Sequence, residues 1–174
     1  MLLLIGGVSR SGKTKLSQKI ALWLRTEGHK VSVLHQDEYV KPESEIPMIR
    51  DHIDWEVPES IDWARWQEAI RSAALSHDWV IAEGLFAFSD QELNQAADRQ
   101  IMVNVSEDTF LQRKREDLRW GQEPEWFIAH IWRSFLIYGE PASFAGLVLS
   151  GEQPQSPHLW QAYLISGKIG EVNQ

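Results

Sequence analysis

The sequence contains no cysteine. The chain therefore cannot form a disulfide, a thiolate nucleophile or a zinc–thiolate site. No apolar run approaches the ~20 residues that a membrane-spanning helix requires. The apolar residues at the N-terminus lead directly into a glycine-rich segment rather than a cleavage site, so no signal peptide is expected. These absences predict a protein of the cytoplasm.

Basic residues are in the minority, with 17 Lys and Arg against 25 Asp and Glu, which gives a net charge of -8. This excess of negative charge argues against nucleic acid or an acidic membrane as the main partner. A length of 174 residues and a hydrophobic fraction of 43% are typical of a single globular domain. We therefore expect one domain over residues 1–174 and leave its oligomeric state open.

The most informative segment is residues 7–14, with the sequence GVSRSGKT. An apolar stretch at residues 2–6 precedes it, and a helix is expected at residues 12–26. A strand, a glycine-rich loop and a helix in this order form a phosphate-binding P-loop. We expect Lys13 to reach the β- and γ-phosphates of a nucleoside triphosphate and Thr14 to bind Mg²⁺. The predicted donor-binding residues of the loop are Gly7, Ser9, Arg10, Ser11, Gly12, Lys13 and Thr14.

The remainder of the chain alternates between predicted strands and helices. Strands are expected at residues 2–6, 31–35, 78–82, 100–105 and 147–149, and helices at 12–26, 58–76, 91–97, 106–119, 125–138 and 157–165. Residues 36–57 are predicted to be mainly loop, and residues 167–174 a loose tail. This alternation predicts an α/β fold of three layers, in which helices cover both faces of a five-stranded parallel sheet.

Acidic residues follow two of the predicted strands, where parallel sheets place their ligands. Glu83 ends an apolar strand and is predicted to hold Mg²⁺, although a solvated acid at a strand end is the alternative. Asp37 follows the second strand and suits the carboxylate with which a kinase orients an acceptor hydroxyl and takes its proton. A guanine-reading Asn-Lys-x-Asp motif is absent, which argues against a guanine-specific switch.

A cluster of charges at residues 112–119 precedes a break at residues 121–124. Arg115 and Arg119 are four residues apart and are expected to share one helix face. Arginines on a closing lid neutralise the charge that develops on a transferred phosphoryl group, and one of them is worth about 10³–10⁵ in rate. We therefore predict a lid at about residues 115–126. Lys114 is interpreted as part of the solvated face.

Nine tryptophans are many for this length. Trp55 and Trp120 lie in polar segments beside candidate catalytic residues. Either could stack on a nucleobase, or simply pack on the surface. The other tryptophans considered are expected in the core or half-buried: Trp23, Trp63, Trp66, Trp79 and Trp160. His35 and His130 show no metal-binding spacing, so packing or hydrogen bonding is expected of both.

Several motifs resemble those of the nicotinamide riboside kinases, small relatives of the uridine kinases. These are GGVSRSGKT at residues 6–14, HQDEYVKPESEI at 35–46, DWEVPESI at 54–61, IAEGLFAF at 81–88, RKREDLRW at 113–120 and HIW at 130–132. The resemblance implies a fold like that of the nucleoside monophosphate kinases, with a helical lid. It also implies phosphorylation of the ribose 5′-hydroxyl of nicotinamide riboside by ATP and Mg²⁺.

The resemblance also assigns roles to individual residues. Asp37 matches the catalytic carboxylate, and Thr14 and Glu83 match the metal site. On the acceptor side, Trp55 and Trp120 match aromatic residues that sandwich the base, Glu56 matches an acid that holds the ribose hydroxyls, and Arg115 matches an arginine near the substrate. The chain departs from the family in two places: Glu56 stands where Asp is usual, and Leu118 replaces a lid arginine, with Arg119, a predicted donor-binding residue, one position further on.

Three functions remain as alternatives. The leading one is an ATP-dependent kinase of nicotinamide riboside, whose cationic base would favour two aromatic faces and nearby acids. The second is a uridine/cytidine kinase or a kinase of another small alcohol. The third is a non-enzymatic nucleotide-binding regulator, which would need neither Asp37 nor a lid arginine. The adenine contacts are not fixed, and residues 150–153 are a plausible place for them.

Overall fold

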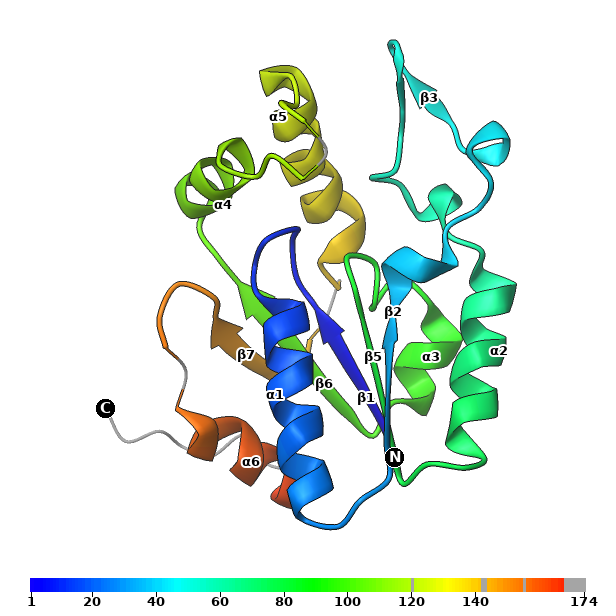
Figure 1. The fold of residues 1–174 in the computed structure, drawn as a ribbon, viewed down its shortest axis with the longest axis vertical. Coiled ribbons are helices and arrows are strands. Elements are labelled where there is room, and N and C mark those ends of the chain that lie inside the picture. The colour runs from blue at the N-terminus through cyan, green and yellow to red at the C-terminus, as the bar shows by residue number, and fades with distance from the viewer. Residues whose placement is uncertain (120, 142–143, 155, 168–174) are drawn as a thin grey trace.

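The sheet at the centre of the molecule has five strands, as predicted, and every neighbouring pair is parallel. The structure is a computed structural model that describes residues 1–119, 121–141, 144–154 and 156–167. The strands run in the spatial order β2-β5-β1-β6-β7 (Figure 1). Their bounds are Leu2–Gly6 (β1), Val31–His35 (β2), Trp79–Gly84 (β5), Arg99–Asn104 (β6) and Leu147–Ser150 (β7). β5 extends two residues beyond the prediction, so Glu83 lies within the strand.

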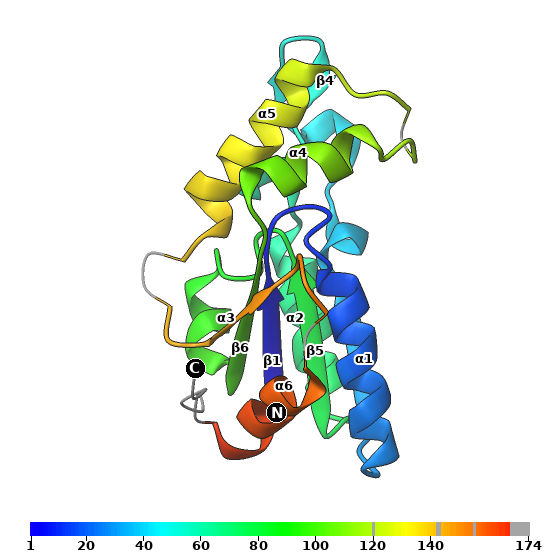
Figure 2. The ribbon, with the colours of Figure 1, turned by 90° about the vertical axis from the view of Figure 1, so that its left-hand side faces the viewer.

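Helices cover both faces of the sheet, because successive side chains of a strand point to opposite faces. Leu3 and Ile5 of β1 pack in one core with α1 (Lys13–Thr26) and α6 (Pro157–Ser166). Leu4, between them, belongs to a second core with α2 (Trp63–Ala74), α3 (Gln91–Ala96), α4 (Glu107–Arg115) and α5 (Glu125–Ser134). Figure 2 shows α4 and α5 beyond the carboxyl ends of the strands, on the same side of the molecule as the loop that follows β1.

Two predicted segments differ from the structure between β2 and α2. The predicted loop at residues 36–57 contains a short hairpin of β3 (Met48–Ile49) and β4 (His52–Ile53), as well as 3₁₀ turns at Gln36–Tyr39 and Glu43–Glu45. Arg50 turns the hairpin with a φ of 55°, so the usual glycine or asparagine signal is missing from the sequence.

The prediction that a helix begins at Pro58 was wrong. Residues Pro58–Ser60 form a 3₁₀ turn, and α2 begins only after Asp62. The side chain of Asp62 accepts a hydrogen bond from the Arg65 N–H at 3.1 Å, which caps the helix. Trp66 on this helix is fully buried beneath the sheet, as expected.

The helix predicted over residues 106–119 was too long. Ser106 caps α4 as expected, accepting from the Thr109 N–H at 3.3 Å, but the helix ends at Arg115. Two acids follow, Glu116 and Asp117, and negative charge is unfavourable at the C-terminal end of a helix dipole. Arg115 and Arg119 therefore do not share a helix face, which corrects the sequence interpretation.

α5 continues into a π-helical turn at Phe135–Gly139, which completes the helix predicted to residue 138. The final predicted helix is α6, one residue longer than expected, and nearly all of the predicted tail lies outside the described residues. None of the helices in the described part of the chain is both long enough and apolar enough to span a membrane.

Candidate active site

The loop of residues 7–14 connects β1 to the N-terminus of α1 (Figure 1). The Ser11 N–H donates to the Val8 carbonyl at 3.1 Å, which closes the loop into a tight turn. Gly12 adopts a φ of 102°, a conformation that side-chain-bearing residues rarely adopt, and it precedes the helix without supplying a side-chain cap. The first N–H groups of α1 therefore point into the loop, where a phosphate group can accept from them.

Three side chains converge at the end of the loop beside β5. The Thr14 hydroxyl donates to Glu83 Oε1 at 2.7 Å, and His35 Nδ1 donates to the same oxygen at 2.7 Å. Glu83 is only 5% exposed, so its carboxylate depends on these donors. A hydroxyl and a carboxylate oxygen are the ligands that Mg²⁺ prefers, with phosphate oxygens and water completing its shell. The donor set thus fits the predicted Mg²⁺ position, although no group of three or more His, Cys, Asp or Glu residues forms a metal cluster among the residues described.

Asp37 lies on the 3₁₀ turn directly after β2, at the same sheet edge as Glu83 and the P-loop. Its side chain is exposed. Its neighbour Gln36 is buried and accepts from the Phe86 N–H at 2.9 Å, which joins the turn to the loop after β5. This hydrogen bond fixes the base from which Asp37 projects.

The predicted acceptor residues Trp55 and Glu56 lie on the loop after β4. Asp54, which is 6% exposed, accepts from the Glu56 N–H at 3.1 Å and from His130 Nε2 of α5 at 2.8 Å. Burial raises the pKa of Glu56 to about 7; Lys114 opposes the rise, while the negative charges of Asp37, Glu123 and Asp54 add to it. Glu56 is thus a carboxyl group whose charge changes near neutral pH.

Lys114 is buried, which corrects its interpretation as a solvated residue. Its ammonium lies 2.8 Å from Glu123 Oε2 and donates to Glu123 Oε1 at 3.1 Å, with the lysine side chain 7% exposed. The positive charge of Lys114 therefore faces inward, toward the acidic residues Glu123 and Glu56.

The two predicted lid arginines have different partners. Arg115 makes a bidentate pair with Glu125 at 2.8–3.2 Å, and both side chains are more than half exposed. Arg119 makes a bidentate pair with Asp117, whose other neighbour is Arg10 of the P-loop at 3.6 Å. Arg119 is thus linked through Asp117 to the P-loop, whereas Arg115 is held at the exposed junction of α4 and α5.

Arg113 joins α4 to the P-loop and to the loop after β7. Its guanidinium donates to the Arg10 carbonyl at 3.1 Å and to the Gly151 carbonyl at 2.9 Å. A Cβ atom on Gly151 would lie 2.2 Å from the Ser11 carbonyl oxygen, so only glycine permits this approach. The loop after β7, the suggested place for the adenine contacts, therefore borders the P-loop.

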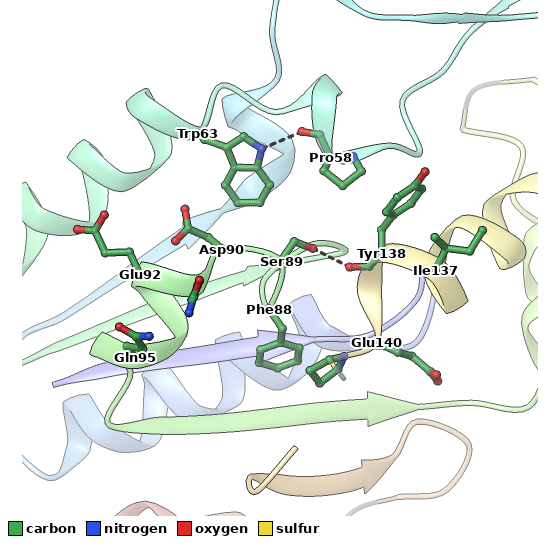
Figure 3. Close-up of a pocket in the computed structure, with 12 residues that line it drawn as sticks. Pro58, Trp63, Phe88, Ser89, Asp90, Glu92, Gln95, Ile137, Tyr138 and Glu140 are labelled. Atoms are coloured by element: carbon green, nitrogen blue, oxygen red, sulfur yellow. Dashed lines mark hydrogen bonds between the residues drawn. The ribbon is translucent and has the colours of Figure 1, made fainter. Parts of the chain in front are cut away.

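A separate groove of about 900 Å³ lies between α3, the start of α2 and the turn after α5 (Figure 3). None of the predicted site residues lines it. Three hydrogen bonds lie along this groove: Trp63 donates to the Pro58 carbonyl, Ser89 to the Tyr138 carbonyl, and Gln67 to Asp90. This groove is therefore distinct from the sheet edge that carries the P-loop.

The donor residues 7–14 with Glu83 and Asp37 lie along one edge of the sheet, as parallel topology requires. Trp120 lies outside the described residues. Asp54, Asp117 and Glu123 were not predicted, because an acid in a polar segment carries no sign that other parts of the chain will cover its side chain. The only available signal was position, since Asp54 precedes Trp55 and Asp117 lies between the two predicted arginines.

Comparison with known proteins places these features in context. No protein-family model matches the chain. It is 27% identical over 153 residues to nicotinamide riboside kinase 1 of Homo sapiens, covering 77% of this chain and 74% of that protein. It is also 27% identical over 164 residues to a uridine kinase of Deinococcus deserti, covering 79% and 76%.

Solved structures share the fold. A gluconokinase from Sinorhizobium meliloti has a TM-score of 0.54 at 16% identity, covering 87% of this chain and 83% of that one. A sugar kinase from Janibacter has a TM-score of 0.56 at 17% identity, covering 94% and 92%. The resemblance to the nicotinamide riboside and uridine kinases is thus confirmed. These similarities support an ATP-dependent phosphotransferase that acts on an alcohol.

Proposed function

We propose that this kinase uses ATP and Mg²⁺ to phosphorylate the ribose 5′-hydroxyl of nicotinamide riboside. The observation that carries the proposal is the excess of negative charge on the acceptor side. The negative charges of Asp37, Asp54 and Glu123 raise the pKa of Glu56 there, against the positive charge of Lys114. A cationic base gains from such surroundings, whereas a neutral pyrimidine does not.

In the proposed reaction the P-loop holds the donor phosphates, with Lys13 on the β- and γ-phosphates. Thr14 and Glu83 would hold Mg²⁺, which neutralises charge on the phosphates when bound. Asp37 orients the 5′-hydroxyl and takes its proton as the oxygen attacks the γ-phosphorus, while the bond from that phosphorus to the β,γ-bridging oxygen breaks and ADP leaves. Arg119 and Arg115 stabilise the charge on the moving phosphoryl group.

On the acceptor side, Glu56 accepts hydrogen bonds from the ribose hydroxyls, and Trp55 and Trp120 stack on the base. The hydrogen bond from the Glu56 N–H to Asp54, and the bond from His130 to the same oxygen, support this arrangement because they fix the loop that carries both Trp55 and Glu56. A place in NAD synthesis and a cytoplasmic location belong to the same proposal.

A uridine or cytidine kinase is the second candidate, favoured by the uridine kinase relative. ADP release measured with nicotinamide riboside, uridine, cytidine and pantothenate separates the candidates. The proposal expects the highest kcat/KM with nicotinamide riboside. A higher value with a pyrimidine nucleoside would move the assignment to the second candidate. Release with none of the four would contradict the nucleoside assignment and favour another alcohol or the regulator.

A further inference from the structure

Asp117 is a buried carboxylate between two arginines that belong to different parts of the site. Its side chain is 3% exposed, although it follows the end of α4 in a segment where Leu118 is 68% exposed. Arg119 donates from Nε to Oδ1 at 2.8 Å and from Nη2 to Oδ2 at 2.7 Å. Its backbone N–H donates to Oδ1 at 3.3 Å, which closes a tight turn.

The second arginine is Arg10 of the P-loop, whose Nε lies 3.6 Å from Asp117 Oδ2. Arg10 has a φ of 64°, an uncommon conformation for a residue with a side chain, and its carbonyl is held by Arg113 of α4. Two contacts therefore join the segment after β1 to the segment around α4. Of these two contacts, the one between Asp117 and Arg10 is an ion pair, in which both groups are charged.

Arg119 also lies within the electrostatic reach of the acceptor side. The hydrogen bond to Asp117 raises the pKa of Arg119, and the charges of Asp37 and Glu123 raise it further. The guanidinium is thus influenced both by a carboxylate fixed against the P-loop and by the carboxylate proposed to take the acceptor proton. In the proposed reaction the phosphoryl group moves from the P-loop, to which Arg10 belongs, to an oxygen held by Asp37.

An unpaired arginine side chain would lose considerable rotamer entropy on reaching one orientation. A bidentate carboxylate removes most of that loss in advance, since its two oxygens match the guanidinium fork. Charges that are oriented before the reaction stabilise a transition state without reorganising during it. Asp117, Arg10 and Arg119 together carry one net positive charge beside the P-loop.

We propose that Asp117 is a positioning residue of the kinase reaction, which holds Arg119 and Arg10 in the orientation that the transferred phosphoryl group requires. The inference rests on the proposed phosphoryl transfer from a P-loop donor and not on the identity of the nucleoside. The proposal also bears on one departure from the nicotinamide riboside kinases. Leu118 replaces a lid arginine in this chain, and Asp117 fixes Arg119 one position further on.

The test is a double-mutant cycle of Asp117→Asn and Arg119→Met in the full chain. Asp117→Asn keeps the size of the side chain but removes its charge, and a misplaced catalytic group costs up to about 10²-fold. We expect kcat to fall by about ten- to a hundredfold, with the nucleoside KM changed far less. In the Arg119→Met background the same change should cost clearly less, because only the contact of Asp117 with Arg10 is left to lose.

Additive losses in the cycle, or an unchanged kcat in Asp117→Asn, would overturn the proposal. Glu68→Gln is the matched control, because it removes an exposed carboxylate from its pair with Arg71 on α2, and it should leave kcat unchanged. If Asp117→Asn does not fold, Arg119→Lys keeps the charge but loses the bidentate geometry. Full kcat in that variant would equally overturn the proposal.

Slow ATP hydrolysis without any acceptor separates this inference from the proposed function. Transfer to water uses the same donor site, so Asp117→Asn should lower it as well. A protein that phosphorylates no nucleoside, but whose ATP hydrolysis falls in this variant, would contradict the nucleoside assignment and support Asp117. Normal hydrolysis in the variant would count against Asp117 whatever the acceptor.

Discussion

At Asp37, replacement by asparagine would keep the size of the side chain and remove its ability to take a proton. We expect Asp37→Asn to bind ATP almost as the unchanged protein does and to lose about 10²–10⁴-fold in kcat. ATP binding by calorimetry and turnover by ADP release check this. Because Asp37 is exposed, the fold should tolerate the change. Normal turnover would remove Asp37 from the mechanism.

Glu56 should make nucleoside binding depend on pH. Its pKa of about 7 means that the carboxyl is protonated below neutral pH and ionised above it. Only the ionised form attracts a cation and accepts two hydrogen bonds. We therefore expect kcat/KM for the nucleoside to rise about tenfold per pH unit below neutrality and to level above it.

A matched variant identifies the group responsible for this pH dependence. Glu56→Gln cannot ionise, so its kcat/KM for the nucleoside should be lower and should lack that rise. ATP itself titrates in the same range, and the comparison at saturating ATP removes its contribution. A profile of the same shape in both proteins would assign the titration to another group.

Individual residues were predictable where a motif fixes both identity and place. Lys13 and Thr14 belong to a contiguous pattern whose geometry is set by strand, loop and helix. Buried ion pairs were not predictable, because the burial of a side chain depends on which residues another segment of the chain places against it. Lys114 lies in a run of charged residues, and its partner Glu123 comes from beyond the break.

At the scale of elements, α4 and the segment before α5 are joined by the buried pair of Lys114 and Glu123. Breaking one partner of such a pair leaves an uncompensated charge, so Lys114→Met should lower the free energy of unfolding by about 3 kcal/mol. Combining it with Glu123→Leu should recover most of that loss, since both charges are then gone. Denaturant unfolding measures both.

The exposed pair of Arg115 and Glu125 provides the comparison within the same two elements. Both side chains are largely in solvent, so Glu125→Gln should leave the free energy of unfolding nearly unchanged. Equal losses from the buried and exposed pairs would show that burial does not determine the stability of this part of the molecule.

Strands and helices were predictable where apolar periodicity is strong, and the five strands were all found. The errors lie where local rules were overridden. The hairpin of β3 and β4 lacks a turn motif, and α4 ends before two acids, of which Asp117 turns inward to bond Arg119. Tertiary contacts of this kind leave no periodic signal in the sequence.

For the whole molecule, ligand binding should stabilise the folded state against unfolding. A ligand at about 100 times its Kd adds about 2.7 kcal/mol to the folded state. In a protein of this size that corresponds to a rise in Tm of roughly 5–10 °C. Thermal unfolding with ATP and Mg²⁺ should show this rise, and chelation of the metal should reduce it. Lys13→Ala should remove most of it, and an equal rise in that variant would place the nucleotide outside the P-loop.

The position of β1 in the sheet has a consequence for biosynthesis. β1 precedes the other strands of the sheet in the chain, but it lies between β5 and β6 and pairs Leu2 with Val80 and Leu3 with Arg99. During translation its backbone gains one strand partner when β5 leaves the ribosome and the second only when β6 does. The P-loop follows β1 directly, yet it can take its final form only after β6 has been made. Nascent chains that stop before β6 should therefore fail to retain nucleotide.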